Sequence, residues 1–310
     1  MRKKGKPFKL GLIPFLSLML IFFAGGCANQ QYKQITLSNL QPISSPAQPA
    51  NPALRVALAT GLSPSQSIAR YQALTNYLAA KLQRPVELVQ RKTYKEVDDL
   101  IREGQVDIAF VCSSSYAIGK DSFGERLVAV PITNGLPYYQ SLIIVNAATG
   151  IRTWDQLKGR SFAFVDPQST SGALYAMSKI KDRGDLKFFS SYIYTYAHVN
   201  SITAVRDHLV DAAAVDSTTF TSMLAKSPDL NSSIRVIDIS PQYANNPVVA
   251  SPRLDERTLL SIQAALLDMD KDELGQQALQ VAGFDKFQLL DDQLFDSVRQ
   301  LVQQVGEGEQ

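Results

Sequence analysis

The chain has few residues of the kinds that form cross-links and metal centres. Its 310 residues include two cysteines, two histidines and one tryptophan. These are too few for a disulfide-stapled scaffold or for a cysteine-ligated metal cluster. Neither a Gly-x-Ser-x-Gly nucleophile elbow nor a Walker phosphate loop occurs in the sequence. The sequence therefore predicts a protein that is not an enzyme and that holds neither a metal ion nor a cofactor.

The N-terminal apolar segment is too short to span a bilayer comfortably. It runs from Leu10 to Ala24 behind five basic residues, whereas a spanning helix takes about 20 residues. Ala24-Gly25-Gly26-Cys27 follows, which is typical of a bacterial lipoprotein signal. We predict a signal peptide over residues 1–26 and lipidation of Cys27, which leaves Cys112 as a single buried thiol. An uncleaved anchor helix is the alternative. Both place the body outside the cytoplasmic membrane, facing the periplasm or the cell exterior.

The remainder of the chain has no excess of positive charge. The leader carries five of the 31 basic residues and none of the 29 acidic residues. The rest therefore has 26 basic and 29 acidic side chains, a net charge of −3. A balance of this kind gives no indication of a nucleic-acid partner.

Residues 27–53 lack sustained apolar periodicity. They are rich in Gln, Asn, Ser, Ala and Pro. A segment with this composition cannot bury enough apolar surface to fold. We predict a disordered tether between the lipidated cysteine and the folded body.

From Leu54 onward, strand patterns alternate with amphipathic helix patterns. Apolar strands begin at Leu54, Val86 and Val106, and helical patterns separate them. A βαβαβ order requires parallel strands joined by right-handed crossovers. A second alternation begins near Thr153, and three closing helices follow Asp255. We predict an α/β clamshell in which lobe I comprises residues 54–143 and 247–310, lobe II comprises residues 144–246, and a ligand cleft lies between them.

A cluster of hydroxyl residues follows the apolar strand at Phe162. Asp166-Pro167 turns the chain, and Ser169-Thr170-Ser171-Gly172 precedes a helical pattern. This order places hydroxyls and unpaired backbone N–H groups at a helix N-terminus, where the helix dipole favours an anion. The alternative is an ordinary helix cap without a ligand.

An ordered set of short motifs resembles the substrate-binding proteins of phosphate, phosphite and phosphonate ABC importers. The motifs that carry the resemblance are Arg84-Pro85-Val86-Glu87-Leu88-Val89, Lys92-Thr93-Tyr94, Gly104-Gln105-Val106-Asp107-Ile108-Ala109-Phe110, Asp155-Gln156-Leu157-Lys158-Gly159-Arg160, Asp166 to Gly172, Tyr196-Ala197-His198 and Val210 to Ser217. The resemblance implies the type II periplasmic-binding fold, with an oxyanion held between the lobes. It implies ligand contacts from Tyr94, Tyr139, Ser169, Thr170, Ser171, His198 and Asp216.

The resemblance also implies a role for each group of contacts. The three cap residues donate hydroxyl and backbone hydrogen bonds, and the two tyrosines donate from the opposing lobe. His198 adds a donor and, if protonated, a charge. Asp216 accepts a proton from P–OH or binds an amino group, which selects against fully ionised anions such as sulfate. The alternatives are that the tyrosines and His198 only pack, and that Asp216 only caps a helix.

Two positions depart from the family pattern. Cys112-Ser113-Ser114-Ser115-Tyr116 stands where the family often has a Gly-Pro turn. We interpret it as a turn that either adds hydroxyls to the cleft or only caps a helix. Val199 follows His198 where the family often has an acid.

The function implied is that of a lipid-anchored, monomeric solute receptor. It would capture a phosphorus oxyanion (phosphate, phosphite or phosphonate) and deliver it to an ABC permease in the membrane. The alternative is a binding protein that signals ligand occupancy to a membrane partner, such as a histidine kinase, without transport. The sequence does not separate the two.

Overall fold

The computed structural model describes residues 52–59, 64–185 and 187–306. The expected signal peptide, Cys27 and most of the expected tether lie outside the described residues. Among the helices in the described ranges, none combines the length and the apolar character that a membrane crossing requires.

The first lobe is built on a six-stranded mixed sheet in the order β13-β4-β12-β3-β1-β2. Its strands are β1 (Leu54–Ala59), β2 (Val86–Arg91), β3 (Ile108–Phe110), β4 (Arg126–Ile132), β12 (Val248–Ala250) and β13 (Lys286–Gln288). Strand β1 pairs in parallel with both β2 and β3, as the βαβαβ pattern predicts. Strand β12 returns from the far end of the chain and inserts antiparallel between β3 and β4.

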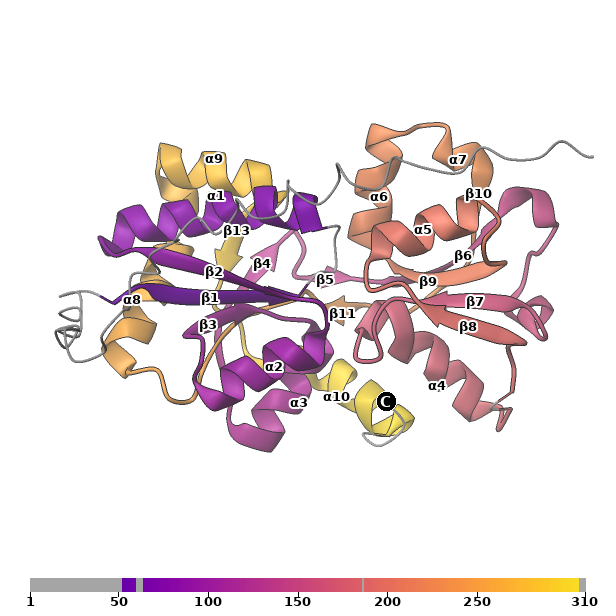
Figure 1. The fold of residues 1–310 in the computed structure, drawn as a ribbon, viewed down its shortest axis with the longest axis horizontal. Helices are drawn as coiled ribbons and strands as arrows, with labels where there is room; N and C mark the ends of the chain where they lie inside the picture. The colour runs from indigo at the N-terminus through magenta and orange to yellow at the C-terminus, as the bar shows by residue number, and fades with distance from the viewer. Residues whose placement is uncertain (1–51, 60–63, 186, 307–310) are drawn as a thin grey trace, which may run out of the picture. The chain divides into compact units, whose positions relative to one another are not determined.

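Five helices cover this sheet (Figure 1). They are α1 (Pro64–Leu82), α2 (Tyr94–Glu103), α3 (Ser113–Phe123), α8 (Glu256–Leu267) and α9 (Glu273–Ala282). Helix α2 begins at a capping box in which Thr93 and Glu96 satisfy each other's backbone N–H groups. Its end is set by Gly104, whose φ of 71° is the left-handed conformation that terminates helices.

The second lobe is built on a five-stranded sheet in the order β10-β6-β9-β7-β8. Its strands are β6 (Ser141–Asn146), β7 (Ser161–Phe164), β8 (Ser191–Tyr194), β9 (Ala212–Asp216) and β10 (Ile234–Ile239). Its helices are α4 (Tyr175–Asp182), α5 (His198–Arg206), α6 (Ser217–Lys226) and α7 (Leu230–Ser233), with short 3-10 turns at Ala147–Thr149 and Trp154–Leu157.

Two chain crossings join the lobes. Strand β5 (Tyr138–Tyr139) runs from the first lobe to the second, and β11 (Tyr243–Ala244) returns beside it. The two strands form an antiparallel pair, with Tyr139 opposite Tyr243. This pair lies between the sheets in Figure 1. Two sheets joined by paired crossings confirm the predicted two-lobe α/β architecture.

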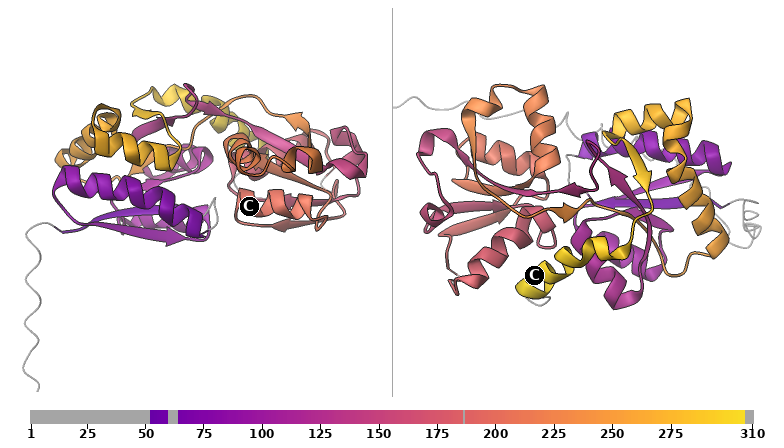
Figure 2. Two further views of the ribbon diagram at one scale, coloured as in Figure 1. Left: turned by 90° about the horizontal axis from the view of Figure 1, so that it is seen from above. Right: turned by 180° about the vertical axis from the view of Figure 1, so that it is seen from behind.

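Helix α10 (Asp296–Val305) packs against both lobes. It contacts α3 of the first lobe and α4 of the second, and Figure 2 shows it crossing from one to the other. Its buried face consists of Val298, Leu301, Val302 and Val305. The 3-10 turn Asp292–Phe295 leads into it. The C-terminal segment therefore connects the two lobes independently of the crossings.

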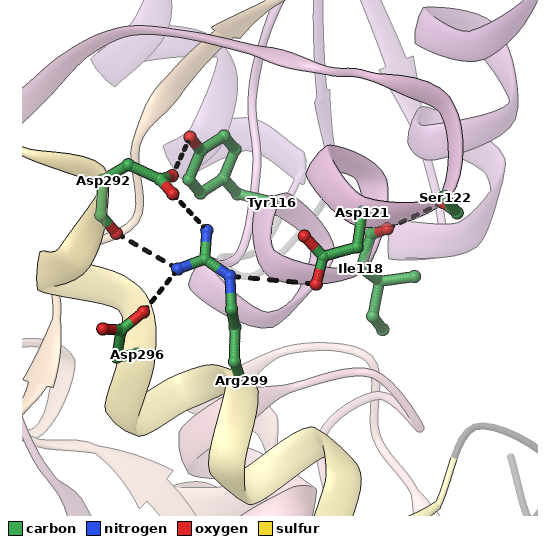
Figure 3. A network of polar contacts seen from close by, with 7 residues as sticks. All are labelled: Tyr116, Ile118, Asp121, Ser122, Asp292, Asp296 and Arg299. Carbon is green, nitrogen blue, oxygen red and sulfur yellow. Dashed lines mark hydrogen bonds and ion pairs between the residues drawn. The ribbon is translucent and has the colours of Figure 1, made fainter.

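An ion cluster holds α10 to α3 (Figure 3). The Arg299 guanidinium lies 2.7 Å from an oxygen of Asp292 and 2.7 Å from an oxygen of Asp296. Its Nε lies 3.8 Å from Asp121 on α3. The Tyr116 hydroxyl, also on α3, donates to the other Asp292 oxygen. The Arg299 side chain is only 16% exposed, so these contacts are shielded from solvent more than an ordinary surface pair.

Helix α3 is the element that differs most from expectation. Residues 112–116 were expected to form a turn, but Ser113 opens a helix that runs to Phe123. Ser113, Ser114 and Ser115 are all fully buried. The sequence pattern did not indicate the helix because its first turn buries hydroxyls rather than apolar side chains.

Candidate functional site

A cavity of about 90 Å³ lies between the two lobes. The first lobe contributes the ends of β1 and β3 and residues of α1 and α2, and the second contributes the first turns of α5 and α6. The lining residues are Ala59, Arg70, Tyr71, Tyr94, Phe110, Val111, Cys112, Pro131, Thr133, Tyr139, His198, Asp216, Thr218, Thr219, Asn245, Asn246 and Phe284. Four of the seven predicted ligand contacts are among them: Tyr94, Tyr139, His198 and Asp216.

The predicted cap residues form a tight turn behind strand β7. The Ser169 hydroxyl accepts from the Gly172 N–H at 3.0 Å, as an N-cap does. Residues Thr170–Leu174 make a π-helical turn that continues into α4. A Cβ at Gly172 would lie 2.5 Å from Val165 Cβ, so the turn requires glycine for close packing rather than for its backbone angle.

Thr170 connects this turn to the N-terminus of α3 in the other lobe. Its hydroxyl oxygen accepts from the Ser114 backbone N–H at 3.0 Å. The same oxygen lies 3.0 Å from the Ser113 hydroxyl and 3.3 Å from the Cys112 sulfur. Helix N-termini carry partial positive charge and unpaired N–H donors. The Thr170 oxygen therefore occupies the kind of position that an oxyanion oxygen would take.

A buried carboxylate makes a second contact between the lobes. Asp166, which is 2% exposed, accepts from the Tyr94 N–H at 3.2 Å and from the Gln168 N–H at 2.9 Å. Burial raises the pKa of Asp166, while these two backbone hydrogen bonds lower it in part. Asp166 thus joins the first turn of α2 to the turn that precedes the cap residues.

The two predicted tyrosines are buried with their hydroxyls near this contact. The Tyr139 hydroxyl lies 3.1 Å from the Ser113 hydroxyl. Burial raises the pKa of Tyr139 well above its usual value, and the Cys112 thiol and the Asp216 carboxylate raise it further. Burial does the same to the pKa of Tyr94. Both phenols therefore stay protonated and can donate a hydrogen bond.

His198 is held as a neutral imidazole. Its Nδ1 accepts from the Asp216 backbone N–H at 3.0 Å, so the proton of the neutral ring is on Nε2. Burial lowers the pKa of His198, and the Asp216 carboxylate opposes this in part. In this geometry His198 would offer a bound anion the Nε2–H donor, and the charge expected of a protonated ring is disfavoured by burial. Asp216 reaches His198 through its backbone rather than its carboxylate, so the pair does not form a catalytic triad.

Asp216 caps helix α6 and also lines the cavity. Its Oδ1 accepts from the Thr219 N–H at 2.8 Å and from the Thr218 hydroxyl. The capping role that we treated as an alternative is therefore present. The cavity contact is present as well, because the residue is part of the lining. One oxygen is used for the cap, and Oδ2 takes part in none of the hydrogen bonds found among the described residues.

The three cap residues do not line the cavity. They are buried behind its wall: Ser169, Thr170 and Ser171 are 1%, 0% and 1% exposed. The Thr170 hydroxyl is within hydrogen-bond distance of the Cys112 sulfur, and Cys112 lines the cavity. The Ser171 carbonyl accepts from the Ser141 hydroxyl at 2.6 Å. The structure thus places the cap next to the predicted cavity residues, with the Ser169 and Thr170 hydroxyls already bonded to protein groups.

Several lining residues were missed by sequence reasoning. Arg70 and Tyr71 come from α1, Phe284 from the turn before β13, and Asn245 and Asn246 from the returning crossing. The Asn246 side-chain oxygen accepts from the Ser113 N–H at 3.1 Å. No local motif marks these positions, because long-range folding alone brings them to the cavity. Within the described ranges, no group of three His, Cys, Asp or Glu side chains is placed to hold a metal ion.

The family model for the periplasmic phosphonate substrate-binding proteins of ABC transporters matches residues 56–295. The phosphate-import protein PhnD of Mycolicibacterium smegmatis is 28% identical over 172 residues, 51% of this chain and 53% of that protein. The phosphonates-binding periplasmic protein of Escherichia coli is 26% identical over 208 residues, 65% of this chain and 61% of that protein. The chain thus matches between half and two thirds of the length of these relatives.

Solved structures show the same fold. A binding-protein component of an ABC phosphonate transporter from Pseudomonas aeruginosa superimposes with a TM-score of 0.75 at 20% identity, covering 81% of this chain and 85% of that one. PhnD1 from Prochlorococcus marinus, solved with methylphosphonate, superimposes with a TM-score of 0.74 at 18% identity, covering 82% and 98%. The predicted periplasmic-binding clamshell is therefore confirmed.

Proposed function

The chain belongs to the family of phosphonate substrate-binding proteins of ABC transporters, and from this membership we propose that it captures a small phosphonate and delivers it to a membrane permease. Phosphate and phosphite are the related ligands that the same chemistry admits. The observation that carries the proposal is the contact between the Thr170 turn and the N-terminus of α3 beside the cavity. Two sets of donors from different lobes meet there, so a bound oxyanion would bridge them.

The donors around the cavity suit a phosphonyl group. The Tyr94 and Tyr139 hydroxyls and the His198 Nε2–H supply neutral hydrogen bonds, and the two helix N-termini supply partial positive charge. Hydroxyl groups that now bond one another would turn their protons toward the anion. Thr170 and Ser113, whose oxygens are 3.0 Å apart, are one such pair.

Asp216 gives the site a preference among oxyanions. Its free oxygen is an acceptor, and a fully ionised anion offers it no proton. A singly protonated phosphonate or phosphate does offer one, through its P–OH group. We therefore propose that the site discriminates against sulfate by leaving Asp216 opposed to a like charge.

We propose that Cys27 anchors the protein to the membrane by a lipid. The support is the basic start, the apolar run and Ala24-Gly25-Gly26-Cys27 in the sequence. Labelled palmitate should enter the wild type and not the Cys27→Ser variant in a bacterial host. Equal labelling of both would refute the anchor without affecting the ligand site.

Calorimetry of the purified full chain tests the ligand proposal. Methylphosphonate, phosphate and phosphite should bind, and sulfate should not. Thr170→Val removes a hydroxyl that would bond a charged ligand, so affinity should fall about tenfold to a hundredfold. Thr221→Val, an exposed position on α6 outside the cavity, is the matched control and should bind as the wild type does.

Two results would contradict the proposal. One is the absence of binding by every phosphorus oxyanion in the panel. The other is a Thr170→Val variant that binds methylphosphonate as tightly as the wild type, which would place the oxyanion elsewhere. A melting curve for each variant separates lost affinity from lost folding.

A further inference from the structure

Arg70 brings a permanent positive charge to the ligand cavity. It lies on α1 beside Tyr71, and both residues are part of the lining. Among the described lining residues, Arg70 is the one side chain that is always charged, because lysine is absent and His198 is held neutral. This charge has no part in the oxyanion contacts described above.

Among the residues that the structure describes, the Arg70 guanidinium has no counter-ion within ion-pair distance. No ion pair or hydrogen bond found among the described residues includes it, and its Nε is buried without a hydrogen-bond partner. By contrast, Arg299 contacts three carboxylates, at Asp121, Asp292 and Asp296. Leaving a buried donor of a charged group unpaired is unfavourable, at about 1–3 kcal/mol or more. Such a group in a cavity wall is available to pair with a bound anion.

Packing fixes the orientation of Arg70. Its guanidinium carbon lies 4.7 Å from the centre of the Phe284 ring, which also lines the cavity. Stacking on an aromatic ring covers one face of the guanidinium and leaves its N–H edge available.

Arg70 is placed to reach a group attached to the phosphonyl head. Its neighbour Tyr71 packs on Phe110, with ring centres 4.7 Å apart. Phe110 ends β3, and the donors at Cys112 and Ser113 follow directly in the chain. Arg70 lines the same cavity as Tyr139 and Asp216, so a second functional group on a short spacer would meet the Arg70 wall.

We propose that the site takes a phosphonate that carries a second anionic group, a carboxylate, and that Arg70 binds this carboxylate. The inference rests on the proposed function and specifies its substrate class. A guanidinium edge matches a carboxylate in a two-pronged hydrogen-bonded pair. An amino group at the same place would meet a like charge and be repelled. The class is therefore short phosphonocarboxylates, of which phosphonoacetate is the simplest probe.

Calorimetry of the full chain with three probes tests this inference: phosphonoacetate, methylphosphonate and 2-aminoethylphosphonate. The wild type should bind phosphonoacetate about tenfold or more tightly than either of the others, as expected for one added charge-assisted pair. Arg70→Gln should lose this preference, with about a tenfold loss for phosphonoacetate and less than about threefold for methylphosphonate. Arg70→Lys, which keeps the charge but not the paired geometry, should fall in between. Arg257→Gln, at an exposed position on α8 outside the cavity, is the control.

The outcomes separate this inference from the proposed function. If none of the three probes binds the wild type, the proposed function is wrong and this inference falls with it. If methylphosphonate binds but phosphonoacetate is no tighter, only the carboxylate assignment is overturned. Equal losses for both probes in Arg70→Gln would show a general charge effect and also overturn it. The wild-type ranking needs no variant, so it decides the question even if a substituted protein fails to fold.

Discussion

At the scale of single residues, the neutral state of His198 determines which groups could balance the charge of an anion in the proposed site. Its Nδ1 is committed to the Asp216 N–H, and burial disfavours the imidazolium. Protonation would place a second donor against a backbone donor and break that bond. In the proposed site, a bound anion would therefore be balanced by helix N-termini, hydroxyls and Arg70 rather than by histidine.

We predict that His198 stays neutral in the ligand-free protein from pH 8 down to pH 6.5. Its pKa lies below the ordinary value of 6.5, so the unprotonated form prevails over this range. Nitrogen-15 NMR of the imidazoles should show one histidine with a proton fixed on Nε2 and no titration. The His208→Gln variant assigns that signal to His198. A His198 signal that moves to the imidazolium position near pH 6.5 would contradict the assignment.

Residues of the candidate site could be predicted from the sequence only where they lie within a short motif. The Ser169-Thr170-Ser171 turn and His198 lie in such motifs, and the structure brings them to one region. Their hydrogen-bond partners could not be predicted, because Cys112 and Ser114 come from another lobe. Arg70 lies in no such motif. In the sequence it looks like any exposed arginine on a helix, and only the segments that fold against it place it in the cavity wall.

At the scale of elements, helices α2 and α3 enclose two carboxyl groups away from the ligand cavity. Asp98 lies on α2 and is 9% exposed, and Glu125 follows α3 and is fully buried. Burial raises the pKa of Asp98 to about 7, with Asp166 and Asp99 adding to the shift and Ser115 and Lys95 opposing it. Burial raises the pKa of Glu125 well above its usual value, and Asp98 adds to that shift. The folded state thus binds protons that the unfolded chain has released.

We predict that Asp98 and Glu125 make the protein less stable as the pH rises from about 4 to 7, against the opposite contribution of His198 below pH 6.5. A raised pKa gives stability that is complete below the unfolded value and is lost as pH rises through the folded value. Asp98 alone contributes a slope of at most about 1.4 kcal/mol per pH unit in this window. Urea unfolding at several pH values measures it.

Substitution of Asp98 isolates its share of this slope. Asp98→Asn should flatten the pH dependence between pH 5 and 7. Glu103→Gln, on the exposed end of the same helix, should leave it unchanged. Equal slopes for the wild type and Asp98→Asn would show that Asp98 is ionised or paired in the folded state.

We predict that Arg299→Ala destabilises the protein by about 1.5–3 kcal/mol, the range for hydrogen bonds to charged groups. Arg299 holds α10 on α3 through Asp292, Asp296 and Asp121 in partly shielded contacts (Figure 3). Chemical unfolding should show the loss. Arg257→Ala, at an exposed position on α8, should change stability by less than about 0.5 kcal/mol. Similar values for the two variants would show that the ion cluster contributes little.

At the scale of the whole folded body, the alternation of strands and helices was enough to predict two lobes. The return of the chain to the first lobe at residue 247 was also predicted, but the insertion of β12 between β3 and β4 was not, because an apolar pattern does not identify the neighbouring strands. The packing of α10 on both lobes was not, since its apolar face gives no information about its partner. The contacts between the lobes depend on buried polar groups, which hydrophobic patterns do not reveal.

Those contacts place the Cys112 thiol where it can report lobe separation. Its sulfur lies 3.3 Å from the Thr170 hydroxyl of the other lobe, and the residue is 4% exposed. A maleimide reagent can reach it only when the lobes part or the region unfolds. A ligand that bridges the lobes favours the closed state and so lowers the open population.

We predict that saturating methylphosphonate slows alkylation of Cys112 about tenfold or more in the Cys27→Ser variant, which has no other thiol. Ligand stabilises the closed form in proportion to its occupancy, so the rate should fall along the binding curve measured by calorimetry. Sulfate should give no protection. Adding Thr170→Val should raise the ligand-free rate, because it removes the contact that crosses from one lobe to the other. The alkylation rate could instead be the same with and without ligand at concentrations where calorimetry shows saturation. That result would mean that binding does not require the lobes to close on the ligand.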